Sequence, residues 1–97
     1  MDRQVRVYGA DTCKETEHTR EYLQELGVPH VYLNVEEDSL AEDRVRSWNY
    51  GKRRTPTLLV SSPVGSETLS VPSDAELDSA LIRHGLLPTS RERASRP

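Results

Sequence analysis

The chain has 97 residues, of which 34% are hydrophobic and 30% are charged, and its formal net charge is −3. A chain of this length forms one domain with a modest core, and this balance is typical of a globular protein. Because charges of both signs are interspersed, no basic region favours a phosphate backbone, which argues against nucleic-acid binding. No apolar run approaches the roughly 20 residues that span a bilayer, and no signal-peptide pattern precedes the first predicted strand, so we expect a cytoplasmic protein without a membrane role.

A strand, a helix and a second strand are predicted in the first third of the chain. Valines alternate with other residues over 5–8, and this strand ends at a turn with Gly9. Apolar and small residues recur at helical spacing over about 13–26, and Gly27 ends that helix. Alternation over 30–35 predicts the second strand. Because this order is that of a βαβ unit, the two strands should pair in parallel.

A helix and a hairpin are predicted next. Asp38 or Ser39 caps a helix that extends to about residue 50, and its apolar stripe begins at Leu40. The segments 55–60 and 67–71 are strand-like and flank a short turn with Pro and Gly. Because the loop between them is short, they should pair as an antiparallel hairpin.

A capping box opens the last predicted helix. Ser73 is the N-cap and Glu76 follows three residues later, while Gly85 ends the helix. Residues 89–97 contain almost nothing apolar, so we expect one domain over 1–88 followed by a mobile tail. The complete order is βαβαββα, which predicts an α/β fold with a four-stranded mixed sheet flanked by three helices on its two faces.

Cys13 is the only cysteine, and it lies between the first predicted strand and the first predicted helix. The first N–H groups of a helix have no intrahelical partner and, with the helix dipole, they put partial positive charge beside the sulfur. This position favours the thiolate, which is the nucleophilic form, over a buried and unreactive thiol. Because a single cysteine excludes an internal disulfide, any disulfide chemistry must involve a second molecule.

Three short patterns stand in order along the chain: Cys13-Lys14-Glu15-Thr16 after the first strand, Arg54-Thr55-Pro56-Thr57 before the hairpin, and Ser73-Asp74 before the last helix. They resemble, in turn, the Cys-x-x-Cys, Thr-Val-Pro and Gly-Gly-x-Asp motifs of the glutaredoxin family. The resemblance extends from Val5 to about Leu87. It implies the thioredoxin fold and a thiol-disulfide oxidoreductase.

The resemblance implies a role for each matching residue. Cys13 would attack a disulfide, and Pro56 would be a cis proline beside the sulfur. Thr16 replaces the second cysteine, so only a monothiol cycle remains, in which Cys13 takes glutathione from a mixed disulfide and a second glutathione resolves the adduct. The hydroxyl of Thr16 would donate to the thiolate. The residues implied to bind the thiol are Tyr8, Thr12, Lys14, Arg53, Arg54, Thr55, Pro56, Ser73 and Asp74.

The implied ligand is glutathione or a related low-molecular-weight thiol. Ser73 and Asp74 would bind its γ-glutamyl group, with helix N–H groups on the carboxylate and Asp74 on the ammonium, although capping alone also explains both residues. Arg53 or Arg54 would hold the glycyl carboxylate, and Lys52 is a third candidate. The thiol would act as co-substrate, with no tightly bound cofactor. Disulfide-containing proteins are further expected partners, and we expect a monomer.

The chain departs from the family pattern at several positions. Ala10 stands where the family often has a lysine, which removes one cation near the sulfur. The carboxylates of Asp11, Glu15 and Glu17 crowd the same turn and oppose ionisation of the thiol. Val71-Pro72 replaces the Gly-Gly pair, which makes close approach of a ligand less favourable there.

Two alternative functions are consistent with these departures. One is a redox-inactive module of the same fold that binds a thiol or a protein. The other is an arsenate-reductase-like enzyme that uses the same cysteine, although the additional Arg-lined region that it would need is not evident. The three histidines have no metal-ligand spacing, and Cys-Lys-Glu-Thr lacks the Gly of the relatives that bind iron–sulfur clusters, so we expect no metal.

Overall fold

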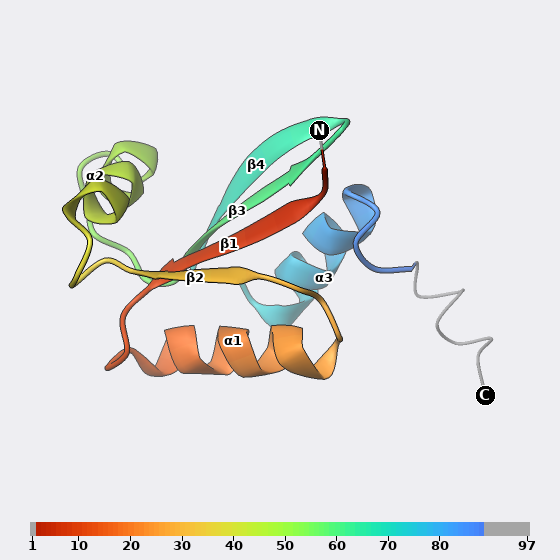
Figure 1. Cartoon of the computed structure of the whole chain (residues 1–97), viewed down its shortest axis with the longest axis horizontal. Coiled ribbons are helices and arrows are strands. Elements are labelled where there is room, and N and C mark those ends of the chain that lie inside the picture. The colour runs from red at the N-terminus through yellow and green to blue at the C-terminus, as the bar shows by residue number, and fades with distance from the viewer. Residues whose placement is uncertain (1, 89–97) are drawn as a thin grey trace.

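The structure is a computed structural model that describes residues 2–88, and this part of the chain forms four strands and three helices (Figure 1). The strands are β1 (Gln4–Gly9), β2 (Val31–Asn34), β3 (Thr57–Ser62) and β4 (Gly65–Ser70), and the helices are α1 (Lys14–Glu25), α2 (Ser39–Trp48) and α3 (Asp74–Arg83). The order βαβαββα and the mixed sheet confirm the predicted fold class. The tail predicted at 89–97 lies outside the described residues.

The strands form one sheet in the order β2-β1-β3-β4. β1 pairs in parallel with β2, as the βαβ pattern predicted, and antiparallel with β3. The hairpin of β3 and β4 is antiparallel and turns over Pro63 and Val64, since Ser62 pairs with Gly65. Because β1 and β3 are antiparallel, β3 begins beside the end of β1, where Tyr8 pairs with Thr57.

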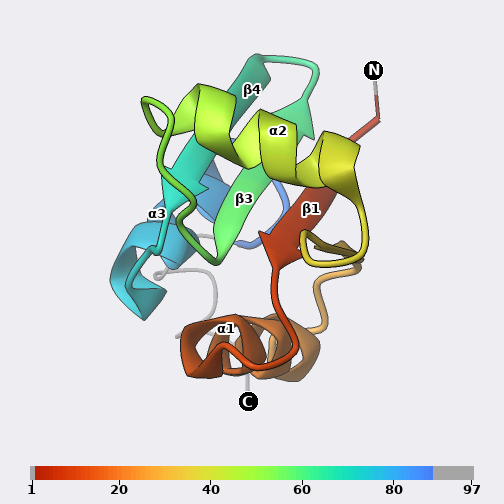
Figure 2. The same ribbon diagram turned by 90° about the vertical axis from the view of Figure 1, so that its left-hand side faces the viewer.

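The helices cover the two faces of the sheet, with α1 and α3 on one face and α2 on the other (Figures 1 and 2). Val7 of β1 packs in the core formed with Leu23 of α1 and Leu77 of α3. The next residue, Tyr8, points to the opposite face and meets Trp48 of α2 edge-on, with ring centroids 5.2 Å apart. None of the three described helices is long and apolar enough to cross a membrane.

α2 begins where it was predicted to begin, but it ends before residue 50 and turns a different side toward the sheet. Its N-cap is Asp38, whose carboxylate accepts hydrogen bonds from two backbone N–H groups of the first turn. The apolar stripe predicted from Leu40 was wrong at that residue, which is 73% exposed, because Ala41 and Val45 define the face against the sheet. The helix ends at Trp48, since Tyr50 has φ 57 and so cannot continue it.

The two hairpin strands begin and end differently from the prediction. β3 begins at Thr57 rather than at residue 55, because Thr55 and Pro56 form no ladder pair with β1. β4 spans Gly65–Ser70 rather than 67–71, because the tight turn lets pairing start immediately after it. Thr55 and Pro56 therefore lie before the sheet, at the edge where β1 leads toward α1.

A matched pair of substitutions tests this assignment of faces. Leu23→Ala should lower the free energy of unfolding by about 2–5 kcal/mol, because Leu23 is fully buried. Leu40→Ala should change it by about 0.5 kcal/mol or less, because Leu40 is exposed. Urea unfolding followed by Trp48 fluorescence measures both. Equal losses in the two variants would contradict the assignment.

Candidate functional site

Cys13 is the residue directly before α1 and forms its N-cap, with an extended backbone (φ −89, ψ 118). Its N–H donates to the carbonyl of Ala10 at 3.1 Å, which closes the turn between β1 and the helix. The side chain is half-buried. The sequence-based prediction that the cysteine stands at the start of the helix is confirmed.

The sulfur of Cys13 has two polar neighbours. Its Sγ lies 3.4 Å from the carbonyl oxygen of Thr55 and 3.4 Å from Oε2 of Glu15. The peptide bond between Thr55 and Pro56 is cis. A thiol has one proton and can donate to only one of these oxygens, whereas a thiolate would face two acceptors. The two nearest oxygens therefore oppose the thiolate that the helix N-terminus favours.

Glu15 is the carboxylate that stays ionised beside the sulfur. A hydrogen bond from its own backbone N–H, and then one from the Cys13 thiol, hold the pKa of Glu15 below its ordinary value. Its carboxylate thus uses an N–H group at the start of α1, where an anion would otherwise be stabilised. Of the predicted crowding carboxylates, Asp11 instead accepts a hydrogen bond from the hydroxyl of Tyr32 at 2.8 Å.

Thr16 lies beneath the loop that precedes the cysteine. Its side chain is 1% exposed, and its Oγ1 accepts a long hydrogen bond of 3.4 Å from the N–H of Ala10. A Cβ on residue 9 would come within 2.4 Å of the Thr16 methyl group. Only a glycine at position 9 therefore leaves room for the Thr16 side chain. Thr16 therefore stabilises the turn between β1 and α1 through its contacts with Gly9 and Ala10. Donation from its hydroxyl to the sulfur stays a prediction.

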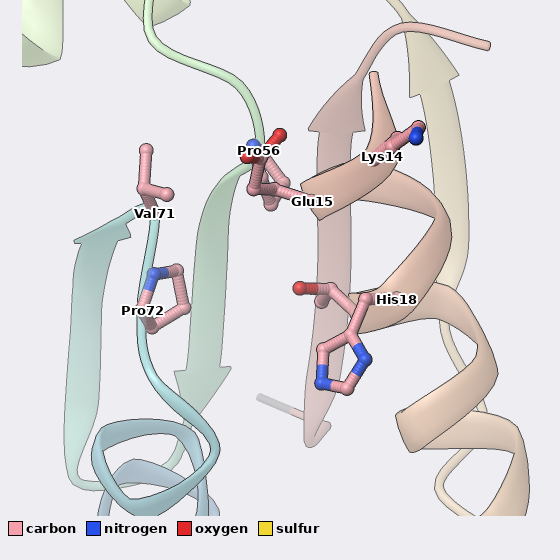
Figure 3. Close-up of a pocket in the computed structure, with 7 residues that line it drawn as sticks. Lys14, Glu15, His18, Pro56, Val71 and Pro72 are labelled. Atoms are coloured by element: carbon pink, nitrogen blue, oxygen red, sulfur yellow. The ribbon is translucent and has the colours of Figure 1, made fainter. Parts of the chain in front are cut away.

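A groove of about 200 Å³ lies between α1 on one side and Pro56, Val71 and Pro72 on the other (Figure 3). Glu15 extends from α1 toward Pro56, whereas Lys14 points away from Pro72. Cys13 does not line the groove, but its sulfur contacts Glu15, which is one of the lining residues. The residues that line the groove are Lys14, Glu15, His18, Thr19, Pro56, Val71 and Pro72.

Val71 has a left-handed backbone with φ 44, which is rare for a β-branched residue. Its N–H donates to the carbonyl of Pro56 at 2.8 Å, so this backbone conformation is tied to the proline at the edge of the groove. The sequence places Val71-Pro72 where the family has Gly-Gly. A conformation suited to glycine is thus present without glycine, and Val71 lines the groove.

Ser73 and Asp74 stand at the start of α3, and both have partners within the protein. The Oγ of Ser73 accepts from the N–H of Glu76 at 3.1 Å, and the N–H of Ser73 donates to Glu76 Oε1 at 2.9 Å, which confirms the predicted capping box. Oδ1 of Asp74 lies 2.8 Å from Nε2 of His18 on α1. The hydrogen bond that His18 donates to Asp74, and then the charge of Asp74, raise the pKa of His18 above its ordinary value.

Sequence reasoning missed His18 as a site residue. His18 belongs to no sequence motif, and it is 56 residues from Asp74 in the sequence. No local pattern signals a contact between two exposed side chains on different helices. Among residues 2–88, no group of three or more His, Cys, Asp or Glu side chains could hold a metal ion.

The three cations before Pro56 differ in their partners. Arg53 forms an ion pair with Glu36, with 3.5 Å between Nη2 and Oε2. Lys52 and Arg54 are exposed and form no ion pair within the described residues 2–88. The structure thus separates candidates that the sequence left equivalent, because only Arg53 has its charge already compensated.

Of the nine predicted thiol-binding residues, only Lys14 and Pro56 line the groove, and Tyr8 and Thr12 are two of the seven that do not. Tyr8 is 0% exposed and packs toward α2, where its hydroxyl accepts a long hydrogen bond of 3.4 Å from Arg44. It supports the end of β1 from the opposite face of the sheet. Thr12 is exposed in the turn directly before Cys13. Of these two, Thr12 is the residue near enough along the chain to meet a ligand on the sulfur.

Comparison with known proteins identifies the family. The model of the family Glutaredoxin matches residues 5–62, and the chain therefore belongs to the glutaredoxin family. No curated protein sequence matches this chain.

Solved structures share the fold of this chain. The thioredoxin-like protein BC3987 is 23% identical with a TM-score of 0.65, and the match covers 80% of this chain and 100% of that one. A point variant of the same protein gives 22% identity and a TM-score of 0.68 over 80% and 94% of the two chains. Maleylacetoacetate isomerase from Anaeromyxobacter dehalogenans 2CP-1, with glutathione in its active site, is 23% identical with a TM-score of 0.57 over 96% and 45%.

The contact between Glu15 and the sulfur predicts how one substitution changes thiol reactivity. Glu15→Gln should speed alkylation of Cys13 by iodoacetamide at pH 7 roughly three- to eight-fold, because a carboxylate no longer opposes the thiolate at 3.4 Å. Glu17→Gln is the matched control, since it removes the same charge from the same exposed helix turn. Equal acceleration in both variants would contradict a specific role for Glu15.

Proposed function

We propose that this protein is a thiol-disulfide oxidoreductase that works with Cys13 alone and uses glutathione or a related low-molecular-weight thiol as co-substrate. The observation that supports this most strongly is the half-buried sulfur at the N-cap of α1, 3.4 Å from the Thr55 carbonyl beside Pro56. Membership of the glutaredoxin family supports the same chemistry. The isomerase of similar fold, with glutathione bound in its active site, supports a thiol of this class as the ligand.

The proposed cycle has two exchange steps. In the first, the Cys13 thiolate attacks the glutathione sulfur of a mixed disulfide, so that a bond forms between Cys13 and glutathione and the second thiol leaves as a thiolate that takes a proton. In the second, the thiolate of another glutathione attacks the bound glutathione sulfur. Glutathione disulfide leaves, and Cys13 is a thiolate again. Each cycle therefore consumes one free glutathione and converts the mixed disulfide into one free thiol and one glutathione disulfide, and Thr16 supplies no second sulfur.

Charged residues that do not line the groove, but are close to its lining residues in sequence or contact them, suit the charged ends of such a ligand. Lys52 and Arg54 have uncompensated charges near Pro56 and suit the glycyl carboxylate. Asp74 at the start of α3 suits the γ-glutamyl ammonium. Pro56, Val71 and Pro72 supply the apolar wall between these two ends. We expect the monomer to act in the cytoplasm, where the reduced thiol pool resolves the adduct.

One observation favours a second candidate, a redox-inactive binding module of the same fold. The Cys13 sulfur faces the carboxylate of Glu15 and the carbonyl of Thr55, and both oxygens favour a protonated thiol. If the thiol stays protonated throughout, the groove would bind a thiol ligand without exchanging disulfides.

Turnover of a small mixed disulfide separates the two candidates. The native chain should reduce the mixed disulfide of glutathione and 2-hydroxyethanethiol, with reduced glutathione as the electron source and the rate set by Cys13. Cys13→Ser should reduce this rate to that of the uncatalysed exchange, because no other cysteine is present. Equal rates for the native chain and the variant would reject the oxidoreductase and leave the binding module.

The two adjacent arginines should differ in their effect on substrate binding. Arg54→Gln should raise the KM for the same mixed disulfide roughly three- to ten-fold with little change in kcat, because it removes the charge of an exposed arginine two residues before Pro56. Arg53→Gln is the matched control and should have a smaller effect, since Arg53 is paired with Glu36. A larger increase for Arg53→Gln would reverse this assignment.

A further inference from the structure

Two polar contacts join α1 to α3 beside the groove. Nε2 of His18 meets Oδ1 of Asp74 at 2.8 Å, and the hydroxyl of Tyr22 donates to Oδ1 of Asp78 at 2.7 Å. The rings of His18 and Tyr22 are stacked, with centroids 6.2 Å apart and an interplanar angle of 8°. The two contacts are one helical turn apart on each helix, so His18 is held toward Asp74 rather than free to turn into solvent.

The His18–Asp74 contact lies at the edge of the groove, because His18 lines the groove and Asp74 does not. His18 is a lining residue on the same side of α1 as Glu15 and one turn farther along the helix (Figure 3). The side chains of His18 and Asp74 are 63% and 49% exposed. Because neither side chain is part of the core, this pair can separate without unpacking the helices, and its strength is that of an exposed ion pair.

We propose that His18 determines ligand specificity, because its imidazolium occupies on Asp74 the position that the ammonium group of a thiol ligand would take. This inference rests on the proposed function, since it concerns the same groove. A thiol with a free amino group must displace His18 from Asp74, whereas a thiol without one need not. The groove therefore discriminates between two chemical classes of thiol, and its preference depends on the charge of His18.

His18 keeps its positive charge to a higher pH than an ordinary histidine. Asp74 raises the pKa of His18, first through the hydrogen bond and then through its charge, and Glu21 and Glu25 on the same helix act in the same direction. Tyr22, with its partner Asp78, Glu17 on the same helix, and the groove residues Lys14 and Glu15 are further titratable groups around it. Competition from His18 is complete below its ordinary pKa and is lost as the pH rises through the raised pKa. Thiols with an amino group should therefore bind more tightly as the pH rises.

S-Methylglutathione tests this inference, because it retains the amino group but has no thiol that can react. In the full chain, NMR titration of the His18 ring should show that saturating S-methylglutathione lowers the pKa of His18. The glutaryl analogue, which lacks the amino group, should leave it unchanged. At pH 6, His18→Gln should tighten binding of S-methylglutathione about two- to five-fold, the range expected when an exposed competing ion pair is removed. His30→Gln, whose ring Nδ1 contacts the Val28 carbonyl away from the groove, should not.

An unchanged His18 titration at saturation, equal effects of the two histidine variants, or no measurable binding of S-methylglutathione would each overturn the inference. The outcome is distinguishable from failure of the proposed function, which requires Cys13 to exchange disulfides. Binding that lowers the pKa of His18 in a chain without turnover would reject the oxidoreductase and retain His18 as the specificity residue. Turnover in a chain whose His18 titration is unaffected by the ligand would retain the oxidoreductase and reject His18 as the specificity residue.

Discussion

The contact between the Cys13 sulfur and the Thr55 carbonyl joins two segments that are 42 residues apart in the sequence. It exists because β1 and β3 pair antiparallel, so that the end of β1 and the beginning of β3 lie at the same edge of the sheet. The chain leaves β1 through a four-residue turn into α1 and enters β3 through the cis Thr55–Pro56 bond. The sulfur, the proline and the groove therefore meet at one place, and the ligand contacts proposed above all depend on this juxtaposition.

Two helix N-termini border this site, and each holds a carboxylate of the protein itself. Glu15 accepts from its own backbone N–H at the start of α1, and Glu76 accepts from the N–H of Ser73 at the start of α3. Both interactions hold the pKa of the glutamate below its ordinary value, mainly through backbone hydrogen bonds. An incoming anion, or a thiolate on Cys13, thus competes with an internal carboxylate rather than entering an empty positive site. Reactivity at Cys13 is a balance between the helix N-terminus and Glu15.

The parts of this structure that local patterns encode could be predicted from the sequence. The cysteine at the start of α1 follows from the Gly turn and the helical spacing after it, and the capping box follows from Ser73 and Glu76 three residues apart. The contact of His18 with Asp74 has no local signal, because it depends on how two helices pack. Leu40 was assigned to the wrong face because a short helix with few apolar residues fixes its rotation poorly.

The most direct test of the central claim compares the folded and unfolded chain, because the claim is that the fold makes Cys13 reactive toward disulfides. The chain is incubated with glutathione disulfide, with and without denaturant, and the glutathione adduct is followed by intact mass. Our account predicts a single adduct on Cys13 that forms faster in the folded chain and is removed by reduced glutathione. An adduct that forms more slowly in the folded chain, or not at all, would contradict it.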